Sequence, residues 1–341
     1  TVITVEGGVS ASAWHFFLPT ATTSNSSQGN NFAPCCTRPP VGSEADAEEG
    51  SLYLSHGLPS YRSLGQSRSL SLTYSSITAD PRPIISLDST LSVRAAVPNS
   101  LSTRLKVGGV QQGGEIYTNS TSLPENADST SRMSVQFDAS NLATGRYPFE
   151  ATVFSNYLNS SVGGISTGNV IVFNRKSSAI GAGWAISDLQ QLHVQPGGGV
   201  LLTSGDGTAL FFSGGPDTFT SPAREFSTLA RNSADGTYTR TYKDGTKSNF
   251  NTQGLQTSIV DRNLNTATFT YDGSARLLAV TDPAGLVTSL TYSGGKLQSI
   301  ADPAGRQTIF QHDSAGNLLR IINPDATFMA YAYDGKGHVT Q

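Results

Sequence analysis

A motif that recurs every 20 to 21 residues in the C-terminal part of the chain constrains the fold more than any other feature. Spacings of 21, 21, 20 and 21 residues separate one aromatic position, which is occupied by Phe250, Tyr271, Tyr292, His312 and Tyr333. A second position follows in phase with the first and is occupied by Asp261, Asp282, Asp302 and Asn323. Two motifs in fixed phase are typical of a repeat array, in which each unit is one supersecondary element stacked on its neighbours.

Each repeat predicts two strands and two turns. Phe269 and Tyr271 are two residues apart and share one face of a strand, and Asp272-Gly273 opens a turn. The returning strand ends at Asp282-Pro283-Ala284-Gly285, where proline suits the second position of a turn and glycine the fourth. We therefore expect a long antiparallel meander, with the aromatic residues stacked in a ladder on one face and the aspartates bonded to turn amides.

Three Asp-Gly-Thr triplets upstream of the periodic region lie between apolar runs. They begin at Asp206, Asp235 and Asp244. Asp-Gly between alternating apolar residues predicts a hairpin with a type I′ turn, in which both central residues have positive φ. Calcium binding is the alternative for these aspartates, but no spaced Asp/Asn ladder accompanies them, which favours the turn.

A proline-rich break, Asp80-Pro81-Arg82-Pro83, divides the chain upstream of the repeats. Residues 1–80 are interpreted as an extended, linker-like segment with isolated strands. Residues 81–175 contain short strands at regular intervals, separated by Gly/Asn/Ser turns, which predicts an immunoglobulin-like β-sandwich. Residues 176–341 form the repeat region, so the whole chain is expected to be all-β.

Two features of the N-terminal region have more than one interpretation. The apolar residues 2–5 form either a strand that pairs with the sheet edge of a neighbouring subunit or an arm over their own domain. Cys35 and Cys36 are adjacent, which fits reduced thiols, inter-chain bridges or a strained vicinal disulfide. The chain starts without Met and ends within a repeat, so a fragment of a longer protein is expected.

The composition and the absence of catalytic motifs argue against several classes of function. A total of 22 Lys and Arg against 25 Asp and Glu gives a net charge of -3, which does not favour binding to nucleic acid or to an anionic membrane. No apolar run reaches the roughly 18 residues of a membrane span. The sequence contains no nucleophile elbow, P-loop, zincin motif or zinc-spaced cysteine pair. We therefore assign no catalytic residue, cofactor or metal site and do not expect an enzyme.

With these repeats, residues 176–341 resemble the Rhs/YD-repeat family, which includes bacterial Rhs proteins, shell components of toxin complexes and teneurin barrels. Gly181-Ala182-Gly183-Trp184 and Lys243-Asp244-Gly245-Thr246 are further points of resemblance. The resemblance implies an extracellular or bacterial cell-surface protein. His312 is interpreted as an aromatic replacement in the ladder. Shell-forming members have many more repeats, so this chain is not expected to close a shell alone.

Three functions are consistent with this resemblance. The first is a non-enzymatic structural segment of a large exported surface or toxin-shell protein. The second is a subunit that polymerises into an extracellular fibre by strand-edge pairing. The third is an adhesion module for carbohydrate or a host receptor. The expected partners are accordingly the rest of the parent polypeptide, neighbouring copies, a glycan or a receptor.

Overall fold

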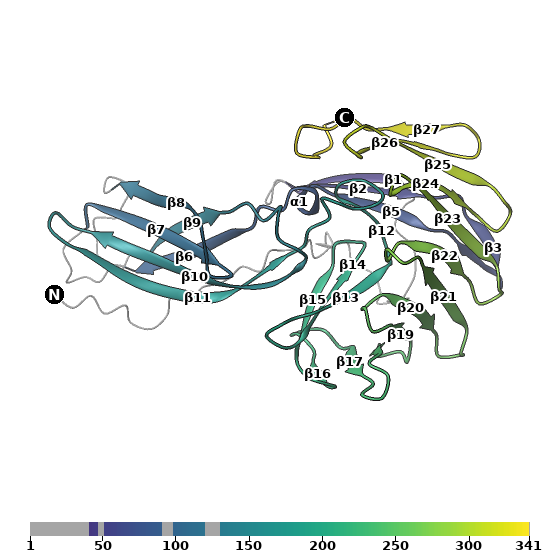
Figure 1. Ribbon diagram of the computed structural model, residues 1–341, viewed down its shortest axis with the longest axis horizontal. Coiled ribbons are helices and arrows are strands. Elements are labelled where there is room, and N and C mark those ends of the chain that lie inside the picture. The colour runs from purple at the N-terminus through teal and green to yellow at the C-terminus, as the bar shows by residue number, and fades with distance from the viewer. Residues whose placement is uncertain (1–40, 47–50, 91–97, 120–129, 341) are drawn as a thin grey trace, which may run out of the picture. The chain divides into compact units, whose positions relative to one another are not determined.

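The structure of the chain is a computed structural model that describes residues 41–46, 51–90, 98–119 and 130–340 (Figure 1). In these ranges every regular element is a strand except the four-residue helix α1 (Ser76–Ala79), so the all-β prediction is confirmed. The strand predicted at residues 2–5 and the pair Cys35 and Cys36 lie outside the described residues.

The described chain forms two compact units, and the chain passes between them at Asp80–Pro81 and at Val172–Phe173. The first unit comprises residues 81–172 within the described ranges. The second comprises residues 41–80 and 173–340 within the described ranges. Each unit has apolar clusters of its own.

The first unit is built from a four-stranded and a two-stranded antiparallel sheet. The larger sheet has the order β11-β10-β7-β8, and β6 pairs with β9. The strands are β6 (Ile84–Thr90), β7 (Ser100–Val107), β8 (Val110–Asn119), β9 (Thr130–Gln136), β10 (Gly145–Asn156) and β11 (Ser161–Val172). Alternate residues of both sheets, such as Leu87, Leu105 and Phe149, share one core, as in a β-sandwich. The relation to immunoglobulins stays a prediction.

The second unit begins with a sheet of order β1-β2-β5-β12, which we call the N-terminal sheet. Its strands are β1 (Val41–Asp46), β2 (Ser51–Gly57), β5 (Ser71–Ser75) and β12 (Trp184–Ile186), and the hairpin β3 (Tyr61–Ser63) and β4 (Gln66–Arg68) lies between β2 and β5 in the chain. Within residues 41–80 the predicted strands are therefore present, but they pair in one sheet and are not isolated. β5 is a central strand because β12, far along the chain, pairs with it from Tyr74 to Leu72.

The remaining strands form two antiparallel sheets. One has the order β13-β14-β15-β16, with β13 (Gln190–Val194), β14 (Val200–Ser204), β15 (Ala209–Gly214) and β16 (Phe219–Thr220). The other, which we call the strip, has 11 strands in chain order, as Figure 1 shows from β17 to β27. They are β17 (Thr228–Arg231), β18 (Tyr238–Thr241), β19 (Lys247–Phe250), β20 (Gln256–Val260), β21 (Thr266–Tyr271), β22 (Leu277–Thr281), β23 (Val287–Ser293), β24 (Lys296–Ala301), β25 (Gln307–His312), β26 (Leu318–Ile322) and β27 (Phe328–Ala330). The predicted antiparallel meander is thus confirmed.

One face of the strip, which we call the inner face, packs against the other sheets of the unit. Leu290, Phe310 and Ile321 of the strip share a core with Tyr74 and Trp184 of the N-terminal sheet. At the other end, Leu229, Tyr238 and Phe250 share a core with the sheet β13–β16. The period-two pattern of each strip strand places these residues on one face, and burial of that face stabilises the unit.

Candidate functional site

The tyrosines of the repeat make one hydrogen bond each to the preceding repeat. The hydroxyls of Tyr271, Tyr292 and Tyr333 donate, each over 2.8 Å, to the carbonyl oxygens of Gln256, Leu277 and Leu318, which lie 15 residues earlier. In the described part of the chain, no ring-to-ring contact joins two ladder positions. The predicted stacking is therefore replaced by a series of hydroxyl-to-carbonyl bonds, which we call the tyrosine ladder.

Burial controls the ionisation of these hydroxyls. It raises the pKa of Tyr292 to about 12 and raises the pKa of Tyr271 and Tyr333 above the usual range for tyrosine. All three side chains therefore remain neutral hydrogen-bond donors over the whole physiological range. Phe250, the first predicted ladder position, has no hydroxyl and lies in the separate core beside β13–β16.

His312 departs from the ladder because a connecting segment, residues 178–183, packs against the strip beside it. Its Nε2 lies 2.8 Å from the carbonyl oxygen of Ile180 instead of bonding within the strip. Next to it, Lys296 Nζ donates to the Ser178 carbonyl and the Leu297 amide donates to the Ala179 carbonyl, both over 2.8 Å. The imidazole thus marks the repeat at which the strip binds its own connecting segment, and burial lowers its pKa.

The glycines of the Gly181-Ala182-Gly183-Trp184 motif fit this segment between the strip and the N-terminal sheet. Gly183 has φ of +77°, and a Cβ there would lie 2.7 Å from the Ser75 carbonyl oxygen. A Cβ on Gly181 would lie 3.0 Å from the backbone nitrogen of Leu318. Trp184 then donates from Nε1 to the Tyr333 hydroxyl oxygen over 2.9 Å, which connects the motif to the tyrosine ladder.

The predicted turn residues fall at equivalent five-residue turns. A carboxylate oxygen of each of Asp261, Asp282 and Asp302 accepts from the amides two and four residues later. Asn323 differs, since its amide nitrogen donates to Thr327 Oγ1 and the neighbouring Asp325 accepts from the Thr327 amide. The carboxylates are therefore used as turn acceptors, and hydrogen bonding lowers the pKa of Asp261, with the Asn265 side chain as the largest cause.

The backbone of these turns corrects one prediction. At the Asp-Gly-Thr triplets only the glycines Gly207, Gly236 and Gly245 have positive φ, so the turns are not type I′. The loops are longer than two residues, and the aspartate accepts from the following threonine amide. A two-residue loop with positive φ at both positions does occur at Gly294-Gly295, between Ser293 and Lys296. That shorter loop accounts for the one 20-residue spacing in the ladder.

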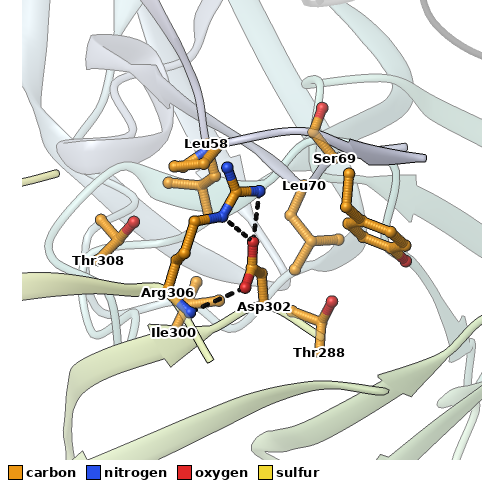
Figure 2. Close-up of a pocket in the computed structure, with 10 residues that line it drawn as sticks. Leu58, Ser69, Leu70, Thr288, Ile300, Asp302, Arg306 and Thr308 are labelled. Atoms are coloured by element: carbon orange, nitrogen blue, oxygen red, sulfur yellow. Dashed lines mark hydrogen bonds and ion pairs between the residues drawn. The ribbon is translucent and has the colours of Figure 1, made fainter. Parts of the chain in front are cut away.

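A small pocket lies where the chain around the β3–β4 hairpin meets the strip (Figure 2). Its lining residues are Leu58, Pro59, Tyr61, Ser69, Leu70, Thr288, Ile300, Asp302, Arg306 and Thr308. Figure 2 shows Arg306 bonded to Asp302, with Nε 2.6 Å from Oδ2, and the guanidinium also donates to the Ser60 carbonyl over 2.6 Å. The pocket encloses about 10 Å³, room for about one water molecule. This pair therefore holds the hairpin and leaves little space for a ligand.

A second polar cluster surrounds Arg175 in the core of the unit. Its guanidinium donates to the carbonyls of Gly205, over 2.8 Å, and Ser204, and it stacks 4.2 Å from the Phe173 ring centroid. Burial lowers its pKa to about 10. Burial, with the nearby guanidinium, also lowers the pKa of His193 to about 4. Ser204 and His193 belong to the sheet β13–β16, so this cluster joins the chain segment around Arg175 to that sheet.

Leu277, Leu297 and Leu318, the first apolar residues after successive turns, form a row that was not predicted. These side chains are almost fully buried, and two of their carbonyls accept the tyrosine bonds. Their 20- and 21-residue spacing in the sequence was the signal that could have found them. Within the described ranges, no group of three or more His, Cys, Asp or Glu could hold a metal ion, and no helix is long and apolar enough to cross a membrane.

Comparison with known proteins yields one family match. The model of the RHS Repeat family matches residues 293–327, which include β24, β25 and β26. The matched stretch contains the predicted residues Asp302, His312 and Asn323. No curated protein matches the chain. The match supports the predicted relation of the repeats to the Rhs/YD-repeat family.

Proposed function

We propose that the chain is a non-enzymatic structural segment of a large exported Rhs/YD-repeat protein, located outside the cell or on the bacterial surface. The observation that carries the proposal is the tyrosine ladder. The side chains that recur once per repeat form bonds between repeats, so the repeated chemistry serves cohesion of the strip.

The use of the charged side chains supports the same proposal. The recurring aspartates accept turn amides, and Arg276 and Arg306 pair with the aspartates four residues before them. A catalytic carboxylate needs access to a substrate, whereas these carboxylates are engaged in their own turns. Their arrangement therefore favours a scaffold over an enzyme.

The N-terminal sheet gives the segment a particular place in such a scaffold. Tyr74 is fully buried against the strip, donates to the Gly337 carbonyl and accepts from the Val339 amide. Trp184 packs with its ring centroid 5.5 Å from Tyr74 and 5.0 Å from Tyr331. The inner face between β21 and β27 is covered by other parts of the same chain. We therefore infer that this part of the strip forms a closed end of the scaffold and does not line an internal cavity.

The proposal is tested in cells that produce the natural protein. Intact cells, periplasm, cytoplasm and medium are separated, and peptides of residues 81–340 are quantified by mass spectrometry with and without external protease. We expect these peptides in the medium or in the protease-accessible surface fraction. Their recovery only from the cytoplasm would overturn the exported role. Fibre formation and binding of a glycan or host receptor stay predictions of the sequence.

A further inference from the structure

Strand β11 is a long sheet edge with a regular backbone. It pairs with β10 along its whole length of 12 residues, from Gly145↔Val172 to Asn156↔Ser161, without a register shift. Among the described residues, no strand pairs with its other side, as Figure 1 shows at the margin of the sheet. Alternate backbone N–H and C=O groups of β11 therefore point outward and can pair with another strand.

The side chains of β11 lack the features that normally prevent edge pairing. Its sequence, SVGGISTGNVIV, contains no charged residue and no proline. Natural edge strands are protected by lysine, proline, bulges or shortness. Ile165 is 64% exposed and Val162 is 40% exposed, so the edge also presents apolar side chains on both faces.

Several other edges in the described residues carry such protection. β8 is interrupted by a register shift opposite Thr103/Leu105 and by Gly113 at φ of +60°, and its Glu115 pairs with Arg104 over 2.7 Å. β6 and β9 carry the ion pair Asp88–Arg132. β27 has only three residues. Among these edges, β11 is the one that is open to pairing.

We propose that β11 pairs antiparallel with β11 of a second copy of this chain, around a two-fold axis at Ser166. A strand that pairs with itself places like residues close together, so a charged strand would repel its copy. β11 carries no charge and avoids this penalty. The pairing joins two four-stranded sheets into one continuous sheet.

The alternation of β11 is compatible with this axis. Residues 162 and 170 pair with Ser155 and Tyr147 of β10 and lie on the core side, whereas Ile165 and Thr167 lie on the opposite side. Around Ser166, Val162 is opposite Val170 of the second copy and Ile165 is opposite Thr167 of the second copy. Core-side residues thus meet core-side residues, as a shared sheet requires. A two-fold pair is closed, so it gives a dimer and not a fibre.

The mass of the full chain in solution is the first test. Sedimentation equilibrium is run from roughly 1 to 100 µM, the range in which moderate interfaces associate. We expect the mass to rise from 35.8 kDa toward twice that value. A mass that stays at 35.8 kDa at every concentration overturns the proposal.

Paired charge variants locate the contact. The double variants Ile165→Lys/Thr167→Lys and Ile165→Glu/Thr167→Glu each place like charges together across the axis and are expected to be monomers. A mixture of the two restores opposite charges and is expected to form a one-to-one dimer, which also shows that both variants are folded. Unchanged dimers of each variant alone, or folded variants that fail to associate when mixed, would contradict the proposed contact.

Val110→Lys is the matched control. Val110 is 64% exposed at the start of β8, at the opposite edge of the same sheet. This variant is expected to dimerise like the parent chain. Loss of the dimer in Val110→Lys would assign the contact to β8 and reject β11. The outcome is independent of the proposed function, because the dimer test uses purified protein and the export test uses fractionated cells.

Discussion

Removal of the tyrosine ladder hydroxyls should destabilise the second unit by a predictable amount. The change is Tyr271→Phe, Tyr292→Phe and Tyr333→Phe, which keeps the rings and deletes three 2.8 Å bonds. A neutral hydrogen bond contributes about 1 kcal/mol, and a buried group left without its partner costs about 1 to 3 kcal/mol. Tyr333 also accepts from Trp184 Nε1, so its replacement affects two partners.

We therefore expect losses of about 1 kcal/mol each for Tyr271→Phe and Tyr292→Phe, about 2 kcal/mol for Tyr333→Phe and about 4 kcal/mol for the triple variant. The free energy of unfolding is measured with urea and tryptophan fluorescence in a Trp14→Phe background. The chain has two tryptophans, and Trp184 is fully buried in the second unit, so the remaining signal reports that unit. Linear extrapolation then compares the variants.

Tyr157→Phe is the control, because the Tyr157 hydroxyl is buried in the first unit without a hydrogen-bond partner. Its removal should leave the unfolding of the second unit unchanged. Two results would refute the reasoning. One is a triple variant within about 0.5 kcal/mol of its background, the scatter expected for additive sites. The other is a Tyr333→Phe loss no larger than that of Tyr271→Phe.

Four further changes probe the turns, the buried arginine and the response to acid. Ala275→Gly should stabilise the second unit by about 1 kcal/mol, because glycine relieves the strain of φ at +61°. Gly305→Ala should destabilise it by about 1 kcal/mol, because φ is +78° there, although no atom lies near the added Cβ. Urea midpoints equal to that of the parent chain would contradict both expectations. Arg175→Met should cost about 3 kcal/mol, because the Ser204 and Gly205 carbonyls lose a charged donor, although Gly205 keeps the Thr73 hydroxyl; an unchanged midpoint would refute that role. His193 has a pKa lowered from 6.5 to about 4, so the unfolded chain binds its proton first. Its contribution to the free energy of unfolding is present above pH 6.5 and is lost as the pH falls toward 4. Urea titrations at each pH should therefore show that the free energy of unfolding falls less steeply with decreasing pH in His193→Gln than in the parent chain.

The strip was predictable from the sequence because its pairings are local. Each strand pairs with the next one in the chain, so the spacing of Tyr271 and Asp282 already reports the strand and turn lengths. The row of Leu277, Leu297 and Leu318 followed the same spacing. It went unnoticed because leucine is common and carries no distinctive turn chemistry.

The N-terminal sheet was not predictable in the same way. The alternation of residues 70–74 predicts a half-buried strand, but Thr73 and Tyr74 have partners in residues 184–205 and 337–339, so no local pattern signals which elements bury them. The turn type was predicted wrongly for a different reason, because Asp-Gly suits both a two-residue loop and a longer loop. The hydrogen bonds that the aspartates accept from later backbone amides favour the longer loop.

The loop at Gly294-Gly295 has a consequence for how such an array can diversify. The ladder keeps its register there, since Tyr292 still pairs with Leu297 and still bonds to the Leu277 carbonyl, although one residue fewer separates the repeats. Changes in chain length are thus absorbed at the rim, while the strands conserve their geometry. The turns between strands can therefore differ in length from one repeat to the next. Mutations that lengthen or shorten one turn can accumulate independently in each repeat without changing the pairing of the strands.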